Sequence, residues 1–185
     1  MSDDEECDVT KVVIIGESGV GKTCIIERFC QNKFTQTTVS TIGAANASAT
    51  VFIGEKGYDL DIWDTAGQEK FHAMGASFYR NAECCVLVCD LTDAKSFETI
   101  DTWRQEFLTQ LAPKDPDNFP FVLLGNKCDK EGERKVAETK IRQYCEVKNH
   151  MPYFETSAKD NTNVDKAFEE IARLAFKRNS KEDEM

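Results

Sequence analysis

The chain has 185 residues, 41% hydrophobic and 30% charged, a composition typical of one globular domain rather than of a disordered or collagen-like chain. Its 33 acidic residues outnumber its 23 Lys and Arg, and the formal net charge of −10 argues against a nucleic-acid-binding protein. No apolar stretch approaches the ~20 residues of a membrane-spanning helix, and the acidic start does not resemble a signal peptide.

The eight cysteines contain no C-x-x-C pair and the chain has only two His, so neither a zinc site nor a disulfide framework is expected. Cys84, Cys85 and Cys89 lie in an apolar run, where a reduced cysteine acts as a small hydrophobe. Reduced cysteines predict a cytoplasmic protein.

Apolar, β-branched runs alternate with segments of helical periodicity along the chain. Strands are expected from residue 9 to the glycine-rich turn and at 51–53, 58–63, 84–89, 121–124 and 152–154. Helices are expected at 23–30, 97–111, 136–147 and 164–174, and the polar residues 32–49 are expected to form an exposed loop leading into an edge strand. This alternation predicts an α/β fold in three layers, with helices on both faces of a mostly parallel sheet and ligands at the carboxyl ends of its strands.

The acidic residues gather partly at the two ends of the chain. We therefore expect an acidic N-terminal tail at 1–8, a globular domain at 9–177 and a C-terminal tail at 178–185. Neither an internal repeat nor an interdomain linker is evident in the sequence.

Residues 16–23, G-E-S-G-V-G-K-T, fit the pattern G-x-x-x-x-G-K-[ST] between a predicted strand and a predicted helix. Gly19 and Gly21 would let the backbone N–H groups approach a polyphosphate at the start of the helix. Lys22 would place its charge at the β- and γ-phosphates, and the Thr23 hydroxyl suits Mg²⁺. An ordinary glycine-rich turn is the alternative, and the strand–helix context argues against it.

A second motif, D-T-A-G-Q, starts at Asp64 directly after a predicted strand. The Asp64 carboxylate would hold Mg²⁺ directly or through water, Gly67 would offer its N–H to a γ-phosphate, and Gln68 would orient the attacking water. Alone, an Asp after a strand is usually a turn residue, but the glycine-rich phosphate motif favours the metal interpretation.

The tetrapeptide N-K-C-D at 126–129 follows the predicted strand 121–124. The Asp129 carboxylate would accept two hydrogen bonds from the N1–H and 2-amino groups of guanine, a donor pair that adenine lacks. Asn126 and the stem of Lys127 would fix and cover the base, and the N–H groups of E-T-S-A-K at 155–159 would reach its O6. In isolation, N-K-C-D is more often a capped turn.

Together with F-Y-R-N-A and W-D-T-A-G-Q-E-K-F, these motifs stand in the order found in Ras-like small GTPases, and the chain resembles the Rab branch from about Thr10 to Ala175. The segments C-C-V-L-V-C-D, P-K-D-P-D-N-F-P-F-V-L-L-G-N-K and P-Y-F-E-T-S-A-K most resemble the late-endosomal and lysosomal Rab proteins. The resemblance implies a P-loop fold with a six-stranded sheet. It also implies a GTP/GDP switch that uses Mg²⁺, hydrolyses GTP and recruits effectors in vesicle trafficking.

The resemblance also assigns roles to individual residues. Catalysis would involve Lys22, Thr41, Gly67 and Gln68, with Thr41 closing on Mg²⁺ beside Thr23 and Asp64. Phe34 would stack against the guanine. The nucleotide-binding residues that the resemblance implies are Ser18, Gly19, Val20, Gly21, Lys22, Thr23, Cys24, Phe34, Thr41, Gly67, Asn126, Lys127, Asp129, Ser157, Ala158 and Lys159. The effector surface that it implies comprises Ile42, Trp63, Phe71 and Tyr79, and a buried core role is the alternative for Trp63.

No arginine of the chain matches a transition-state finger, so the resemblance implies slow intrinsic hydrolysis by a monomer and a GAP that supplies the arginine. An exchange factor, a GDP-dissociation inhibitor and effectors would be its other partners.

Three features depart from the Rab pattern. Asn46 replaces an effector-contacting Phe, Thr38 replaces an aromatic near the phosphates, and the last cysteine is Cys145. Attachment to a membrane would therefore need a prenylated C-terminus that this chain does not contain, either because the chain is shortened or because the protein is naturally unanchored.

Two other functions are compatible with a phosphate-binding loop. A P-loop kinase would need an arginine-bearing lid and an acceptor site, and it would not need N-K-C-D. A nucleotide-locked adaptor would bind partners without cycling, and the presence of Lys22, Thr23, Thr41, Asp64 and Gln68 argues against it.

Overall fold

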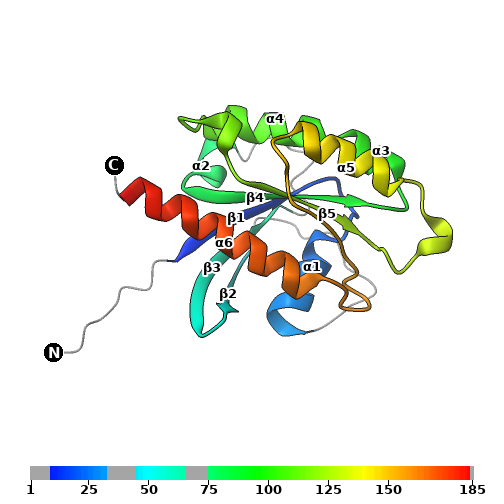
Figure 1. Cartoon of the computed structure of the whole chain (residues 1–185), viewed down its shortest axis with the longest axis horizontal. Coiled ribbons are helices and arrows are strands. Elements are labelled where there is room, and N and C mark those ends of the chain that lie inside the picture. The colour runs from blue at the N-terminus through cyan, green and yellow to red at the C-terminus, as the bar shows by residue number, and fades with distance from the viewer. Residues whose placement is uncertain (1–8, 33–44, 66–74, 184–185) are drawn as a thin grey trace.

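The computed structural model describes residues 9–32, 45–65 and 75–183, which form one six-stranded sheet covered by helices on both faces (Figure 1). The strands are β1 (Thr10–Ile15), β2 (Ala45–Ile53), β3 (Lys56–Asp64), β4 (Ala82–Asp90), β5 (Phe121–Asn126) and β6 (Tyr153–Glu155). They are ordered β2-β3-β1-β4-β5-β6. All neighbouring pairs are parallel except β2 and β3, which form an antiparallel hairpin. The predicted α/β architecture is confirmed.

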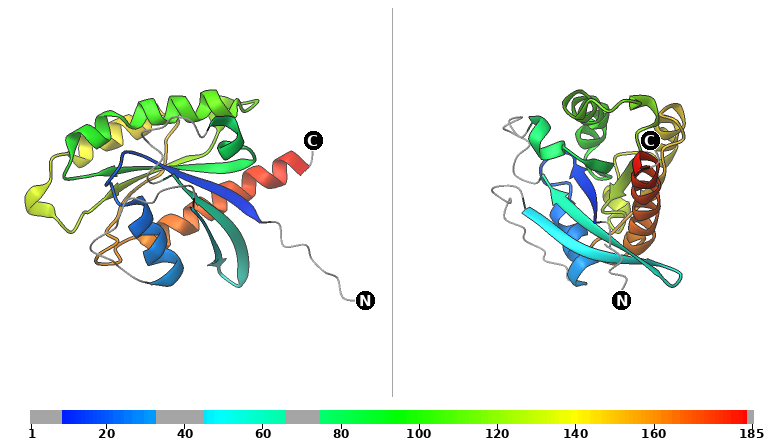
Figure 2. Two further views of the ribbon diagram at one scale, coloured as in Figure 1. Left: turned by 180° about the vertical axis from the view of Figure 1, so that it is seen from behind. Right: turned by 90° about the vertical axis from the view of Figure 1, so that its left-hand side faces the viewer.

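The helices are α1 (Lys22–Gln31), α2 (Gly75–Tyr79), α3 (Ala94–Glu98), α4 (Ile100–Leu111), α5 (Glu138–Val147) and α6 (Val164–Asp183), with short 3₁₀ turns at Pro116–Asn118 and Glu131–Glu133. One face of the sheet is covered by α1 and α6, and the other by α2 to α5 (Figures 1 and 2). None of the helices in the described ranges is long and apolar enough to cross a bilayer.

The sheet residues alternate between two cores. In β1, Val12 and Ile14 face α1 and α6, whereas Val13 and Ile15 face the opposite helices. All nine residues of β4 are buried, as a strand covered on both faces requires. Burial raises the pKa of the Cys84 thiol within this strand, which keeps it protonated as a small apolar group.

The structure differs from the sequence-based boundaries at the edge of the sheet. Residues 45–49 were expected to be loop, yet β2 begins at Ala45 and pairs residue for residue with β3 from Asp64 to Lys56. The small side chains give little strand propensity, and the hydrogen-bonded ladder of the hairpin overrides it. Cross-strand bonds from Asn46 to Asp61 and from Thr50 to Asp59 add to the pairing.

The helix predicted at 97–111 is divided at Thr99 into α3 and α4. Asp93 caps α3 by accepting a hydrogen bond from the Lys95 N–H, so a helix begins three residues before Phe97, the first residue of the expected apolar stripe. The helix expected at 136–147 begins later, at Glu138, and α6 continues beyond residue 177 to Asp183.

Candidate nucleotide-binding site

The carboxyl ends of the parallel strands meet at one edge of the sheet, and the predicted motifs follow them. The loop after β1 holds the glycine-rich motif, β3 ends at Asp64, β5 ends at Asn126, and the E-T-S-A-K loop follows β6. Segments far apart in the sequence are therefore brought to one edge, as the sequence predicts.

Two glycines of the phosphate-binding loop lie where a side chain would not fit. A Cβ on Gly16 would lie 2.3 Å from the Val88 carbonyl oxygen of β4. At Gly21 the φ angle is +99°, and a Cβ there would lie 2.3 Å from Nδ2 of Asn126. Glycine at these positions lets the loop lie directly against β4 and β5, which brings the phosphate motif next to N-K-C-D.

Lys22 is the first residue of α1 and is 2% exposed. Its Nζ donates to the carbonyl oxygens of Gly16 and Glu17, each over 2.7 Å. A buried ammonium is costly unless it has oxygen partners, and these two carbonyls hold it inside the loop. The ammonium is therefore fixed where a polyphosphate bound by the loop would meet it.

The Thr23 hydroxyl donates to Oδ2 of Asp64 over 2.5 Å, and Asp64 is 4% exposed. A hydroxyl from the start of α1 and a carboxylate from the end of β3 thus converge at one point. Both are hard oxygen donors of the kind that Mg²⁺ prefers, so these residues fit the predicted metal site.

N-K-C-D is joined to the phosphate-binding loop by two side chains. Asn126 Nδ2 donates to the Val20 carbonyl over 2.9 Å, and Lys127 Nζ donates to the Gly19 carbonyl over 2.9 Å. Lys127 also pairs with the Asp90 carboxylate at 2.8 Å. These contacts fix the two motifs relative to each other.

The E-T-S-A-K loop is joined to N-K-C-D in turn. The Thr156 hydroxyl donates to Oδ1 of Asn126 over 3.2 Å, and the Ser157 hydroxyl donates to the Asp129 carboxylate over 2.8 Å. Arg28 of α1 donates to the carbonyls of Ala158 and Lys159 over 2.7 and 3.1 Å. Sequence reasoning missed Arg28, Asp90 and Thr156, since their roles arise from contacts between distant segments.

Glu155, at the end of β6, is held from two sides. Arg134 binds its carboxylate with both guanidinium arms at 2.8 and 2.6 Å, and the Tyr153 hydroxyl donates to it over 2.6 Å. Hydrogen bonds from Arg134 lower the pKa of the Glu155 carboxyl group, so it is ionised at neutral pH. This cluster fixes the start of the E-T-S-A-K loop.

The remaining predicted residues are distributed as follows. Ser18 and Gly19 are exposed, Val20 is buried, and Cys24 is half-buried beside the core. Phe34, Thr38, Thr41, Ile42, Gly67, Gln68 and Phe71 lie outside the described residues. The roles predicted for these seven residues stay predictions.

The family model described as the Ras family matches residues 11–177, a range that includes every loop of this site. The chain belongs to the Ras family. As a member of this family, the protein binds GTP and GDP and is a GTP hydrolase.

Similar curated proteins place the chain among Rab-type GTPases. It is 51% identical over 165 residues to "Ras-related protein Rab-7a" of Paramecium octaurelia, covering 89% of this chain and 80% of the relative. It is 49% identical over 174 residues to "Ypt/Rab-type GTPase ypt7" of Schizosaccharomyces pombe, covering 94% and 85%. For "Ras-related protein RABG3c" of Arabidopsis thaliana the identity is 51% over 175 residues, covering 94% and 85%.

The described part of the predicted effector surface of this Rab-like GTPase comprises Trp63 and Tyr79. The ring of Phe78 packs edge-on against Trp63 with 5.2 Å between centroids, and Lys11 Nζ lies 4.0 Å from the Trp63 ring centroid. Tyr79 points elsewhere: its ring packs on Phe107 of the core, and burial raises its pKa. The structure therefore brings Phe78 beside Trp63 and Tyr79 beside Phe78, and the role of Tyr79 in effector binding stays a prediction.

Proposed function

We propose that the protein is a GTP/GDP switch in late-endosomal or vacuolar trafficking, with Asp129 reading guanine and Lys22 binding the phosphates. The observation that carries this proposal is the bond from Asn126 to the Val20 carbonyl, since it joins the base-reading motif to the phosphate-binding loop. The trafficking role rests on the Rab7 and Ypt7 names of the relatives.

Guanine recognition follows from the carboxylate of Asp129. The Ser157 hydroxyl donates a hydrogen bond to Oδ1 of Asp129. This bond would orient the Asp129 carboxylate to accept two parallel hydrogen bonds from the base. Replacing guanine by adenine would remove the donor pair and leave the carboxylate facing the lone pair of N1 and the C2–H group. Selectivity for guanine is the expected consequence.

Thr23 and Asp64 would hold Mg²⁺, Asp64 directly or through water, with Thr41 as a third protein ligand in the GTP-bound state. The ion would neutralise charge on the β- and γ-phosphates. In the structure the Thr23 hydroxyl donates to the Asp64 carboxylate. Metal binding is compatible with this bond, because a hydroxyl that ligates a cation through an oxygen lone pair can still donate its hydrogen.

Hydrolysis would depend on positioned groups rather than on a strong base. Lys22 would stabilise charge on the γ-phosphate, the Gly67 N–H would bind one of its oxygens, and Gln68 would orient the attacking water. The sequence offers no arginine finger, so a GAP would supply it and set the rate of turnover.

An exchange factor, a GDP-dissociation inhibitor and effectors are the remaining partners that we propose. Effectors would contact Trp63 together with Ile42 and Phe71. Asn46 forms a hydrogen bond with Asp61 at 3.2 Å, so a polar pair stands where Rab effectors usually meet an aromatic ring. We therefore expect an effector with a polar group opposite this position.

A single-turnover hydrolysis assay separates this switch from a nucleotide-locked adaptor. We expect slow release of phosphate from bound GTP, with acceleration by a Rab GAP that carries an arginine finger. Bound GTP that remains intact with and without the GAP would support the adaptor instead. Transfer of the γ-phosphate to a small acceptor, rather than to water, would support a P-loop kinase.

A further inference from the structure

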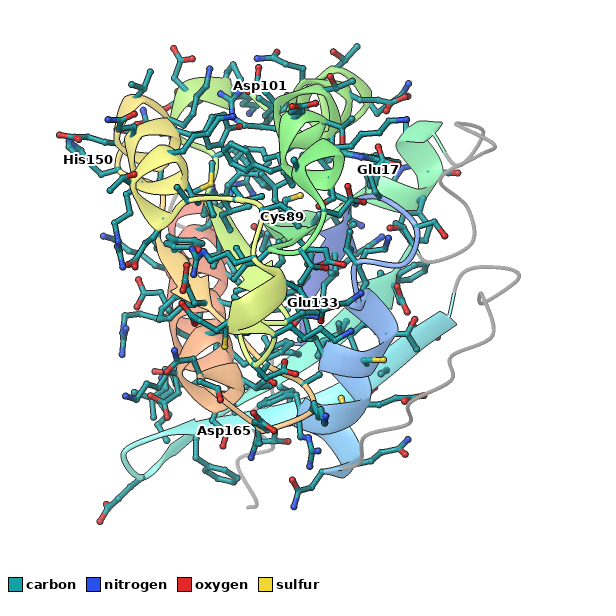
Figure 3. The ribbon with its side chains drawn as sticks, turned by 90° about the vertical axis from the view of Figure 1, so that its right-hand side faces the viewer. Glu17, Cys89, Asp101, Glu133, His150 and Asp165 are labelled. Atoms are coloured by element: carbon teal, nitrogen blue, oxygen red, sulfur yellow. The ribbon has the colours of Figure 1, made fainter. Side chains whose placement is uncertain are left out.

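Glu17 connects the phosphate-binding loop to α4. It is the second residue of the loop, and Figure 3 shows it on the α4 side of the loop. The indole Nε1 of Trp103, on α4, donates to Oε1 of Glu17 over 3.3 Å, across a sequence separation of 86 residues. The loop therefore has an attachment besides those to β4 and β5.

The same residue also holds the lysine of the site. The backbone carbonyl of Glu17 accepts a hydrogen bond from Lys22 Nζ over 2.7 Å. The orientation of this carbonyl depends on the loop backbone at Glu17, which the side-chain bond to Trp103 restrains. A contact on α4 is thus linked to the position of the ammonium that would meet the phosphates.

Trp103 is a suitable anchor because it cannot shift easily. It is 8% exposed and belongs to the core between the sheet and α4. A large aromatic ring in a packed core is restricted to one position, so its N–H group points in a fixed direction.

The segment that carries Trp103 is fixed at the guanine end as well. In α3, the Ser96 hydroxyl donates to the Asp90 carbonyl over 3.1 Å and accepts from the Asp90 N–H over 2.9 Å. The Asp90 carboxylate pairs with Lys127. The two ends of the nucleotide site are therefore connected through α3 and α4 in addition to the direct contacts between their loops.

We propose that Trp103 is a positioning residue for Lys22, acting through Glu17, and that this connection slows the release of bound nucleotide. The inference rests on the proposed binding of phosphates by Lys22. It differs from the roles already described because neither Trp103 nor the Glu17 side chain is assigned a contact with the nucleotide.

The first test measures dissociation of fluorescently labelled GDP in the full chain. Trp103→Phe keeps an aromatic side chain but removes the N–H group along with the five-membered ring, and we expect GDP release about 3- to 10-fold faster, as for loss of one hydrogen bond. Glu17→Ala should have a similar effect. The double variant should release GDP no faster than the stronger single variant, because both changes remove the same bond.

Tyr144→Phe is the matched control. The Tyr144 hydroxyl donates to the Asp101 carboxylate of α4 over 3.0 Å. The variant therefore also removes a hydrogen bond from an aromatic side chain to a carboxylate, but this bond does not involve the phosphate-binding loop. We expect unchanged GDP release for it. If Tyr144→Phe speeds GDP release as much as Trp103→Phe does, the effect is a general destabilisation of the protein and the proposal is overturned. The proposal is also overturned if the double variant speeds GDP release by the product of the two single effects, because the two side chains would then act independently.

The second test does not require nucleotide binding, so it separates failure of this inference from failure of the proposed function. The chain has two Trp, and their indole N–H resonances are assigned with Trp63→Phe and Trp103→Phe. Glu17→Ala should shift the Trp103 indole resonance and speed its hydrogen exchange, whereas Glu17→Gln, which retains an acceptor oxygen, should change both less. An indole resonance unaffected by Glu17→Ala would contradict the bond itself.

Discussion

The Ser157 hydroxyl donates to the Asp129 carboxylate over 2.8 Å, joining the loop after β6 to the loop after β5. The same hydroxyl accepts a hydrogen bond from the Asp160 N–H over 3.0 Å. Ser157 is therefore fixed by its own loop while it orients Asp129. This relationship holds the proposed base-reading carboxylate in a defined position.

Replacing Asp129 by Asn is expected to weaken GTP and GDP binding by about 100-fold or more, because the charged acceptor is lost and the Asn NH2 group would face one of the two donors of guanine. Binding of ATP should change little. Asp165→Asn makes the same change on the exposed first turn of α6 and serves as the control. Titration calorimetry with each nucleotide checks this, and guanine affinity equal to that of the unchanged protein would remove Asp129 from the site.

Replacing Thr23 by Asn is expected to reduce the Mg²⁺ dependence of nucleotide binding, since the variant loses the hydroxyl that we assign to the metal. GTP binding should weaken more than GDP binding, because the γ-phosphate shares the ion. The measurement is the affinity for each nucleotide with Mg²⁺ and with EDTA. Thr109→Asn, on an exposed part of α4, should bind as the unchanged protein does. An undiminished effect of Mg²⁺ in Thr23→Asn would contradict this assignment.

Replacing Gly16 by Ala is expected to lower the free energy of unfolding by about 1–3 kcal/mol, as overpacking does in a close-packed core. The added Cβ would lie 2.3 Å from a backbone oxygen of β4, which cannot move without displacing the strand. Gly132→Ala is the control, since no atom lies within 4 Å of its Cβ position. Urea denaturation monitored by circular dichroism checks both variants, and equal stability of the two would show that the loop accommodates the methyl group.

The Arg134–Glu155 pair predicts a dependence of stability on pH. Because its pKa is lower in the folded state, the Glu155 carboxyl stabilises the fold above its ordinary pKa of about 4.3, and this contribution is lost as the pH falls through the lowered value. The protein should therefore unfold at a higher temperature than Glu155→Gln at pH 7, with a difference that shrinks in acid. Glu138→Gln, in an exposed pair with Arg142, should show little difference at either pH. If the difference in unfolding temperature between the protein and Glu155→Gln persists in acid, the difference arises from packing rather than from the charge of Glu155.

Replacing Gln68 by Leu is expected to slow GTP hydrolysis by about 100-fold and to leave nucleotide affinity near that of the unchanged protein. This prediction rests on the sequence motif, since Gln68 lies outside the described residues. Single-turnover hydrolysis measures the chemical step, and Gln143→Leu on exposed α5 is the control. Hydrolysis by Gln68→Leu at the rate of the unchanged protein would show that Gln68 does not orient the water.

The sequence predicted that the motifs would meet at one edge of the sheet, because each motif is local. Gly16 to Thr23 and Asn126 to Asp129 each follow a strong apolar run, and parallel strands end at a common edge. The start of β2 at Ala45 was not predicted, because Ala, Asn and Ser have low strand propensity, and pairing with β3 makes these residues a strand.

Contacts between residues far apart in the chain could not be predicted from the sequence either. Nothing near Arg28 indicates that its guanidinium reaches the carbonyl of Ala158, 130 residues away. Tyr79 and Phe78 are adjacent aromatics, and the orientation of α2 decides which of them meets Trp63. Which of these side chains make contact depends on tertiary packing, which cannot be read from a single sequence.

Calorimetric titration of the nucleotide-free protein with GTP and with ATP, each in the presence of Mg²⁺, tests the central claim most directly. We predict tight binding of GTP and no detectable binding of ATP, because Asp129 meets a donor pair only on guanine. Equal affinities for the two nucleotides, or binding of neither, would contradict the claim that these loops form a guanine nucleotide site.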